Sequence, residues 1–155
     1  MDIRVAKPDD AVEICDVLCR SITELCEADH RYNPEILRRW LGNKTEANLR
    51  DWTSRSGQIF TVAVIDGAIA GVGAVSAADG ILLNYVSPDY QYRGVSKAIM
   101  KALELWLVQQ GQTCSRLHST TTARSFYEKI GYLPNGEPET RKTGLVSFPM
   151  IKQLG

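Results

Sequence analysis

The sequence predicts an α/β (α+β) fold in which helices flank a mixed, mostly antiparallel central sheet. Helical apolar periodicity dominates the first third of the chain, and three β-branched apolar runs separated by two Asp-Gly pairs follow it. The pattern then changes to helix, strand, helix and strand. Turn-linked strands run antiparallel, whereas two strands joined by a crossover helix run parallel, so one sheet should contain both directions.

The first third of the chain predicts one short strand followed by an amphipathic helix. Residues 3–7 (IRVAK) alternate like a strand, and either Asp9 or Asp10 after Pro8 can cap the helix. One apolar face is expected to be buried, and it consists of Ala11, Ile14, Cys15, Leu18, Ile22, Leu25 and Cys26.

A second, shorter helix is predicted next. Asn33 is a good N-cap, Pro34 suits a first helical turn, and Gly42 or Asn43 should end the helix. Residues 45–55 (TEANLRDWTSR) predict one or two further helical turns.

Three strands joined by tight turns come next. The apolar runs and the turns between them are residues 59–65, Asp66-Gly67, residues 68–77, Asp79-Gly80 and residues 81–87. An Asp-Gly pair between apolar runs favours a hairpin turn, so we expect an antiparallel meander.

The second half of the chain alternates helices and strands. The remaining predicted elements are a helix from Val95 to Trp106 that Gly111 ends, a strand at 115–120, a helix at 121–131 and a strand at 145–154. Thr121 or Thr122 is the expected cap of the second helix, and Gly131 its end.

Length and charge limit the domain organisation and the class of partner. A chain of 155 residues is long enough for one sizeable core and short for two, so we expect a single domain over residues 1–155. The 18 basic and 18 acidic residues cancel, which argues against a nucleic-acid or anionic-membrane partner. The N-terminus lacks the pattern of a signal peptide and no segment is long enough to span a bilayer, so a cytoplasmic location is expected.

We expect the four cysteines to be free thiols in the core. Cys15, Cys19 and Cys26 lie on one predicted helix, and Cys114 is far from them in the sequence. A metal site formed by the three helical cysteines and His30 is the alternative, but these cysteines coincide with the apolar face of the helix. We therefore expect no metal.

A strand, a glycine turn and a helix meet at residues 84–100 (NYVSPDYQYRGVSKAIM). The start of a helix carries unpaired N–H groups and the positive end of the helix dipole, so residues 93–97 can hold a phosphate, with Arg93 and Lys97 adding charge. The alternative is an ordinary turn with solvated charges. The spacing matches neither a P-loop nor a GxGxxG turn.

Two motifs and the order of the elements resemble the GCN5-related N-acetyltransferases. VSPDYQYRGVSKAIM is similar to the acetyl-CoA loop of that family, with Gln91 and Gly94 in register, and TARSFYEKIGY resembles the family helix that often carries a tyrosine, here Tyr127. The resemblance covers nearly the whole chain and implies an acyl-CoA N-acyltransferase-like fold. Ser96 stands where the family prefers glycine or alanine, and Thr120 where asparagine is frequent.

The resemblance also implies an activity and a set of binding residues. It implies an acetyl-CoA-dependent N-acetyltransferase that transfers the acetyl group directly to an amine acceptor in a ternary complex. The pyrophosphate of acetyl-CoA is expected on the start of the helix, and the pantetheine arm along the preceding strand. The expected cofactor-binding residues are Asn84, Val86, Gln91, Arg93, Gly94, Val95, Ser96, Lys97 and Thr120.

The chemistry needs an acid and a base. The Tyr127 phenol can protonate the departing thiolate, although a packed core tyrosine is the alternative. An alkyl amine is protonated at neutral pH, and His118 is a candidate to remove its proton, although a packed or solvated histidine is the alternative. Residues 81–86 (ILLNYV) contain no carboxylate, whereas many family members have a glutamate there.

The acceptor side of the site is marked by acidic residues. Glu24, Glu27, Asp29 and His30 can attract or deprotonate a cationic amine, or can form a solvated helix end. Trp40 and Trp52 can line the acceptor pocket or belong to the core. A non-catalytic CoA-binding module and a nucleotide-binding module stay open as alternative functions, and the protein is expected to be a monomer or a homodimer.

Overall fold

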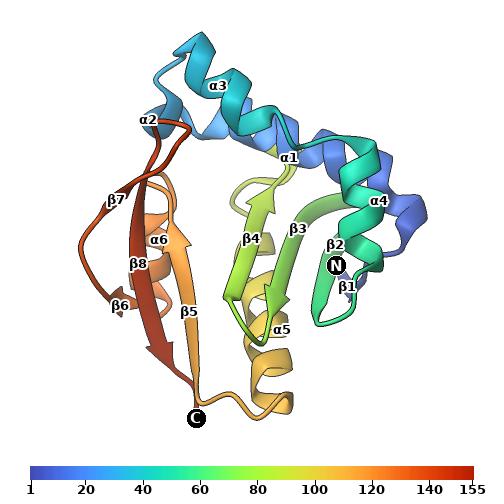
Figure 1. The fold of residues 1–155 in the computed structure, drawn as a ribbon. Coiled ribbons are helices and arrows are strands. Elements are labelled where there is room, and N and C mark those ends of the chain that lie inside the picture. The colour runs from blue at the N-terminus through green and yellow to red at the C-terminus, as the bar shows by residue number, and fades with distance from the viewer.

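Two antiparallel sheets lie side by side in the computed structural model, which describes residues 1–155 (Figure 1). The first sheet has the order β1 (Asp2–Val5), β2 (Gln58–Ile65), β3 (Ala68–Ser76) and β4 (Gly80–Val86). The second sheet has the order β5 (Cys114–Ser119), β8 (Val146–Gln153) and β6 (Leu133–Pro134), and β7 (Glu139–Thr140) also pairs with β8. The predicted meander is confirmed, because β2, β3 and β4 pair antiparallel in sequence order.

Helices cover both faces of the first sheet. The helical elements are the 3₁₀ turn η1 (Pro8–Asp10), α1 (Ala11–Leu25), α2 (Glu27–His30), α3 (Pro34–Leu41), α4 (Glu46–Ser54), the 3₁₀ turn η2 (Pro88–Tyr90), α5 (Val95–Gln109) and α6 (Arg124–Lys129). One apolar cluster joins α1 and α4 to one face of the sheet through Ile14, Leu49 and Val72, and a second joins α5 and α6 to the opposite face through Ile99 and Tyr127. None of the helices has both the length and the apolar character needed to cross a membrane.

The fold class is confirmed, with one difference in how the strands join. Figure 1 shows β4 and β5 pointing the same way, as expected for strands joined by the crossover helix α5. No backbone ladder joins them, however, so the expected central sheet is divided into two halves. We call the line along which β4 and β5 face each other the seam.

The seam is closed at one end and open at the other. A Cβ atom on Gly80, at the start of β4, would lie 2.3 Å from the carbonyl oxygen of Arg116 in β5, so the two backbones touch there. The pairing of β4 with β3 then shifts register between Ala74 and Val75, which leaves Leu82 as an extra residue in β4. A bulge of this kind bends a strand, so β4 turns away from β5 beyond Leu82.

Two glycines of β3 fix the position of α5. A Cβ atom on Gly73 would lie 2.3 Å from the Ile99 side chain, and one on Gly71 would lie 2.5 Å from the Val95 side chain. Because both positions lack a side chain, α5 packs directly against the β3 backbone. The first turn of α5 is thereby held beside the end of β4.

The helix caps are partly as predicted. The Asn33 side chain accepts hydrogen bonds from the N–H groups of Glu35 (3.0 Å) and Ile36 (3.2 Å), so this cap is confirmed. The Asp10 carboxylate instead accepts from the Lys7 N–H (2.8 Å) and pairs with Arg4, so the prediction that an aspartate caps the free N–H groups of α1 is wrong.

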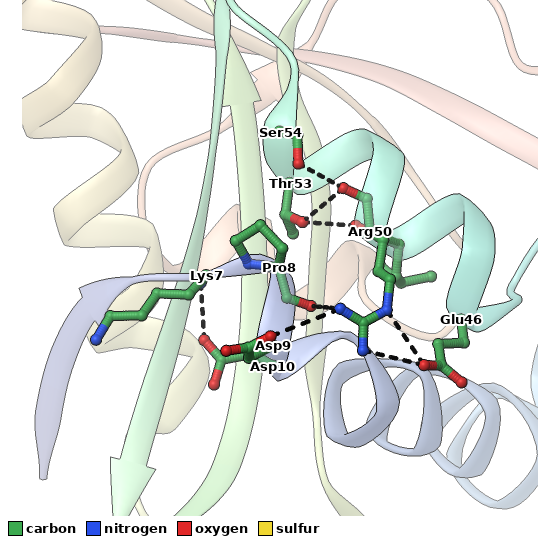
Figure 2. A network of polar contacts seen from close by, with 9 residues as sticks. Lys7, Pro8, Asp9, Asp10, Glu46, Arg50, Thr53 and Ser54 are labelled. Carbon is green, nitrogen blue, oxygen red and sulfur yellow. Dashed lines mark hydrogen bonds and ion pairs between the residues drawn. The ribbon is translucent and has the colours of Figure 1, made fainter.

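Helix α4 is tied to η1 by polar contacts. In Figure 2 the Arg50 guanidinium reaches the Pro8 carbonyl oxygen (3.2 Å), the Asp9 carboxylate (3.7 Å) and the Glu46 carboxylate (3.1 Å). The contacts with Pro8 and Asp9 hold α4 against the start of α1, on the side of the molecule away from the open end of the seam, and the Glu46 contact within α4 orients the guanidinium.

Candidate active site

A groove of about 420 Å³ lies where β4, η2, α5 and the β5–α6 loop meet. Its other wall is the end of α1, through Ser21, Leu25 and Cys26. The groove brings together eight of the nine predicted cofactor-binding residues, namely Asn84, Val86, Gln91, Gly94, Val95, Ser96, Lys97 and Thr120.

The first turn of α5 forms the floor at one end of the groove. Gly94 precedes it with φ = 76°, a left-handed conformation that side chains rarely adopt, while a Cβ there would meet nothing within 4 Å. The backbone conformation, and not a lack of space for a side chain, therefore explains why a glycine stands at position 94. The N–H groups of a first turn have no partner within the helix, and α5 has no acidic residue in that turn, so an anion meets positive potential here.

Side chains around this turn differ in where they point. Lys97 and Ser96 line the groove, and the Ser96 hydroxyl forms no hydrogen bond within the protein. Arg93 does not line the groove, because its guanidinium lies over the Tyr90 ring at 5.4 Å from the ring centre. Arg93 can thus add long-range charge and its backbone N–H, but its side chain is stacked on Tyr90.

A second, smaller cavity of about 50 Å³ occupies the open end of the seam between β4 and β5. We call it the slot. Tyr127 and His118 both line the slot, so the structure brings the two predicted catalytic residues to one cavity. The slot and the groove share Asn84, Tyr85, Thr120 and Ala123 in their walls, and they therefore adjoin.

Tyr127 is held in an apolar environment. Its side chain is 6% exposed and packs edge-on against Phe126 and Tyr132, with ring centres 5.4 and 5.7 Å away. Burial raises the pKa of Tyr127 to about 12, and the hydrogen bond that Asn84 donates from Nδ2 to the phenol oxygen (3.4 Å) lowers it in part. The phenol therefore keeps its proton at neutral pH.

His118 lies at the exposed side of the slot. Its side chain is half exposed, and Nδ1 is 3.9 Å from a carboxylate oxygen of Glu139 in β7. Sequence reasoning missed Glu139, because β7 is only two residues long and shows no strand periodicity.

The four predicted acceptor residues have different surroundings. Glu24 pairs with Arg20 (3.0 Å), which also forms a bidentate ion pair with Asp89 of η2 (2.9 and 3.1 Å). Glu27 is exposed, and its carboxylate has no hydrogen-bond or ion-pair partner in the protein. Arg20 and Asp89 therefore tie α1 to the segment that leads into α5.

Asp29 ties α2 to the loop between β5 and α6. Its carboxylate accepts hydrogen bonds from the backbone N–H groups of Thr121 (2.7 Å) and Thr122 (3.0 Å) and from the Thr122 hydroxyl. The Thr120 hydroxyl accepts from the Ala123 N–H (3.1 Å) just before α6. The prediction that Thr121 or Thr122 caps α6 is therefore wrong, because α6 begins at Arg124 and its start has no side-chain cap.

His30 belongs to the core. The ring is fully buried, Nδ1 accepts from the Tyr32 N–H (2.9 Å), and Nε2 lies 2.9 Å from the Ile22 carbonyl oxygen and 3.1 Å from that of Thr23. Acceptance at Nδ1 places the proton of a neutral ring on Nε2, which then donates to these carbonyls. Both ring nitrogens are thus occupied, and the geometry does not support an acceptor role for His30.

Cys26, Trp40 and Trp52 fit the core interpretation, whereas Cys15, Cys19 and Cys114 are only partly buried. Cys26 and Trp40 pack with Ile22 in one buried cluster, and Trp52 packs against the cluster under α1. Burial raises the pKa of Cys15 to about 11 and that of Cys26 to about 12, as expected for thiols in apolar surroundings. No group of three or more His, Cys, Asp or Glu side chains is arranged to hold a metal ion.

Comparison with known protein families gives one match that covers most of the chain. Residues 28–154 match the acetyltransferase (GNAT) domain. The N-acetyltransferase YafP of Escherichia coli (strain K12), itself uncharacterized, is 26% identical over 133 residues, which are 85% of this chain and 81% of that protein. BSU40680 of Bacillus subtilis (strain 168) is 39% identical over 65 residues, so the match spans only 44% of that relative and 42% of this chain.

Solved structures share the same fold. A GCN5-related N-acetyltransferase from Rhodopseudomonas palustris superposes with a TM-score of 0.86 at 26% identity, covering 99% of this chain and 95% of that one. The PaiA N-acetyltransferase from Thermoplasma acidophilum, solved in complex with coenzyme A, gives a TM-score of 0.78 at 21% identity, with 99% and 100% coverage.

Proposed function

Because the chain belongs to the GNAT acetyltransferase family, we propose that it is an acetyl-CoA-dependent N-acetyltransferase. The acetyl group would pass directly to a primary amine of a small molecule or peptide in a ternary complex, and residues 1–155 would form one catalytic domain. The observation that carries this proposal is the continuity of the groove at the start of α5 with the slot that contains Tyr127.

The residues present fit acetyl-CoA. The groove offers an unobstructed helix start, Lys97 and the Ser96 hydroxyl to a pyrophosphate. The edge of β4 that faces the seam has no ladder partner and can pair with the amide groups of a pantetheine arm. We therefore assign Asn84, Val86, Gln91 and residues 93–97 to this ligand, with Thr120 at the opposite wall.

The proposed catalytic groups are those that line the slot. When bound, acetyl-CoA supplies the acetyl group as an activated thioester. The Tyr127 phenol holds a proton at its oxygen and would donate it to the departing sulfur, and a backbone N–H at the edge of β4 would polarise the carbonyl. The raised pKa keeps this proton in place across the neutral range.

The acceptor amine would enter from the side of His118. A cationic amine must lose a proton before attack, and His118 with Glu139 beside it is the group best placed to accept that proton. Glu24 and Glu27 would attract the cation from the end of α1 and from α2. We leave Asp29 and His30 out of the acceptor contacts, because hydrogen bonds within the protein already occupy them.

A second candidate function is CoA binding without catalysis. The absence of a carboxylate from β4, whose polar side chains are those of Asn84 and Tyr85, favours it. The two functions differ in whether an amine consumes the bound thioester. A cytoplasmic location and a monomeric or homodimeric state stay predictions.

Calorimetry and a thiol-release assay together test the proposal. We expect CoA and acetyl-CoA to bind with micromolar affinity, and we expect free thiol to appear when the right acceptor from a panel of amines, amino acids, polyamines, aminoglycosides and peptides is added. No heat at millimolar CoA would contradict the whole assignment. Binding without thiol release from any class of amine would favour the non-catalytic module.

A further inference from the structure

We propose that the Asn84 side chain positions Tyr127 and also contacts the ligand in the slot: Nδ2 holds the phenol, and Oδ1 accepts an N–H from the pantetheine arm. This inference rests on the proposed function and assigns to Asn84 a role beyond the backbone pairing expected of its strand.

The first observation is an unsatisfied atom. Asn84 Oδ1 is the only buried side-chain oxygen or nitrogen without a hydrogen-bond partner in the protein. A buried acceptor without a donor destabilises a fold, and native structures usually satisfy such groups. Because Asn84 lines both cavities, a ligand that widens the slot can bring the missing donor to this buried atom.

The second observation is the place of Asn84 in the strand. Ile81 and Val86, near it on β4, pack in the apolar cluster that also contains Tyr127, and Asn84 pairs across the sheet with Gly73. An apolar side chain would satisfy packing at this position. A carboxamide there adds no packing that leucine lacks, so its polar atoms are the feature that needs an explanation.

The third observation is the direction of the amide. Nδ2 donates to the Tyr127 oxygen (3.4 Å), which leaves the phenol hydrogen without an acceptor in the protein. The opposite orientation of the amide would let Oδ1 accept that hydrogen and would remove it from the reaction. Donation from Asn84 also stabilises the phenolate, which opposes the effect of burial on the Tyr127 pKa.

These observations give Asn84 two polar atoms with two tasks. Asn84 lines both the groove and the slot, so a ligand arm that passes from one to the other must cross it. The donor end of the amide fixes the acid, and the acceptor end fixes the arm that carries the sulfur.

Calorimetry with two probes tests the contact with the arm. For the Asn84→Leu variant we expect CoA to bind about tenfold more weakly than to the wild type. Adenosine 3′-phosphate 5′-diphosphate, which is CoA without its pantetheine arm, should bind both proteins equally. Equal affinity of the two proteins for CoA would overturn the contact, while absence of CoA binding to the wild type would instead refute the proposed function.

A double-mutant cycle with Tyr127→Phe tests the positioning role. Asn84→Leu should lower kcat at saturating acetyl-CoA at least tenfold in the wild type and should have no further effect on Tyr127→Phe, because the phenol through which Asn84 acts is gone. The same fractional loss in both backgrounds would overturn the positioning role.

Thermal unfolding separates this role from a structural one. Without ligand, Asn84→Leu should melt at the same temperature as the wild type or higher, because the change removes an unsatisfied acceptor. A clear fall in Tm would mean that Asn84 serves the fold and would overturn the inference. Asn84→Asp serves as a second variant of nearly the same shape, and it should lower kcat in the same cycle, since a carboxylate cannot donate to the phenol.

Discussion

The two ends of the seam use the same pair of strands in opposite ways. At the closed end Gly80 and Arg116 bring their backbones into contact, and at the open end Asn84 and Thr120 face each other across a cavity. The bulge at Leu82 lies between the closed end and the open end of the seam. One extra residue in β4 therefore lies between a part of the seam where the two backbones touch and a part where a cavity separates them.

The largest expected effect is at the open end. Tyr127→Phe should lower kcat by about 10²- to 10⁴-fold, the range of general acid catalysis, and should leave CoA affinity within about twofold. Stopped-flow or steady-state thiol release with calorimetry measures both quantities. Unchanged turnover would remove Tyr127 from the mechanism.

Tyr132 is the matched control for that change. Its buried phenol donates to Glu104 (2.8 Å) and lies 2.7 Å from the Ser115 hydroxyl, outside the slot and the groove. Tyr132→Phe should therefore reduce the free energy of unfolding by about 1–3 kcal/mol and leave kcat nearly unchanged.

The next effect is at the closed end. Gly80→Ala should reduce the free energy of unfolding by roughly 3–4 kcal/mol, because φ is +84° and the new Cβ would meet the Arg116 carbonyl. Gly67→Ala is the control, since it has φ +79° with nothing within 4 Å and should lose only about 1–2 kcal/mol. Equal losses in urea unfolding would show that the contact with Arg116 does not hold the seam.

A smaller effect is expected where α2 spans the open end. Asp29→Ala removes three hydrogen bonds to the β5–α6 loop and should cost about 1–2 kcal/mol of stability. Because Thr120 and Thr122 line the groove, CoA should also bind several-fold more weakly. Glu27→Ala, on the same short helix, should change stability by less than about 0.5 kcal/mol, and an equally large effect there would contradict the role of Asp29.

The smallest effect concerns the far end of the groove. Ser96→Ala should weaken CoA binding by about three- to tenfold if the unpaired hydroxyl donates to a phosphate oxygen. Pantetheine, which lacks the pyrophosphate, should bind the variant and the wild type equally in calorimetry. Tighter CoA binding by the alanine variant would show that the hydroxyl hinders the ligand.

Much of the fold was predictable because its signals are local. Asn33 and Pro34 mark the start of α3, and Asp66-Gly67 and Asp79-Gly80 mark the turns of the meander. Local residues alone left the function of the 84–100 segment open. The resemblance to a family, carried by two motifs, selected residues that the structure brings together in one groove, and their role in binding CoA stays a prediction.

The rest depends on contacts between distant residues. Thr121 and Thr122 look like helix caps, but their N–H groups bond to Asp29, 92 and 93 residues away. His30 follows Glu27, Ala28 and Asp29, a sequence that suggests a solvated helix end. Packing against distant residues nevertheless buries it. The bulge at Leu82 lies inside the continuous apolar run Ile81–Leu83, where no alternation of apolar and polar residues could mark it. The separation of β4 from β5 could therefore not be predicted from the sequence.

The open end of the seam also bears on the risk of edge-to-edge pairing between copies of the protein. Beyond Leu82, β4 and β5 are two sheet edges with unpaired backbone groups, and exposed edges of this kind recruit strands from other chains. Here the edges face each other inside the molecule, and the Arg20–Asp89 and Asp29–Thr121 contacts hold α1 and α2 over them. Edges enclosed in this way are less open to pairing with a second copy of the protein than free sheet edges would be.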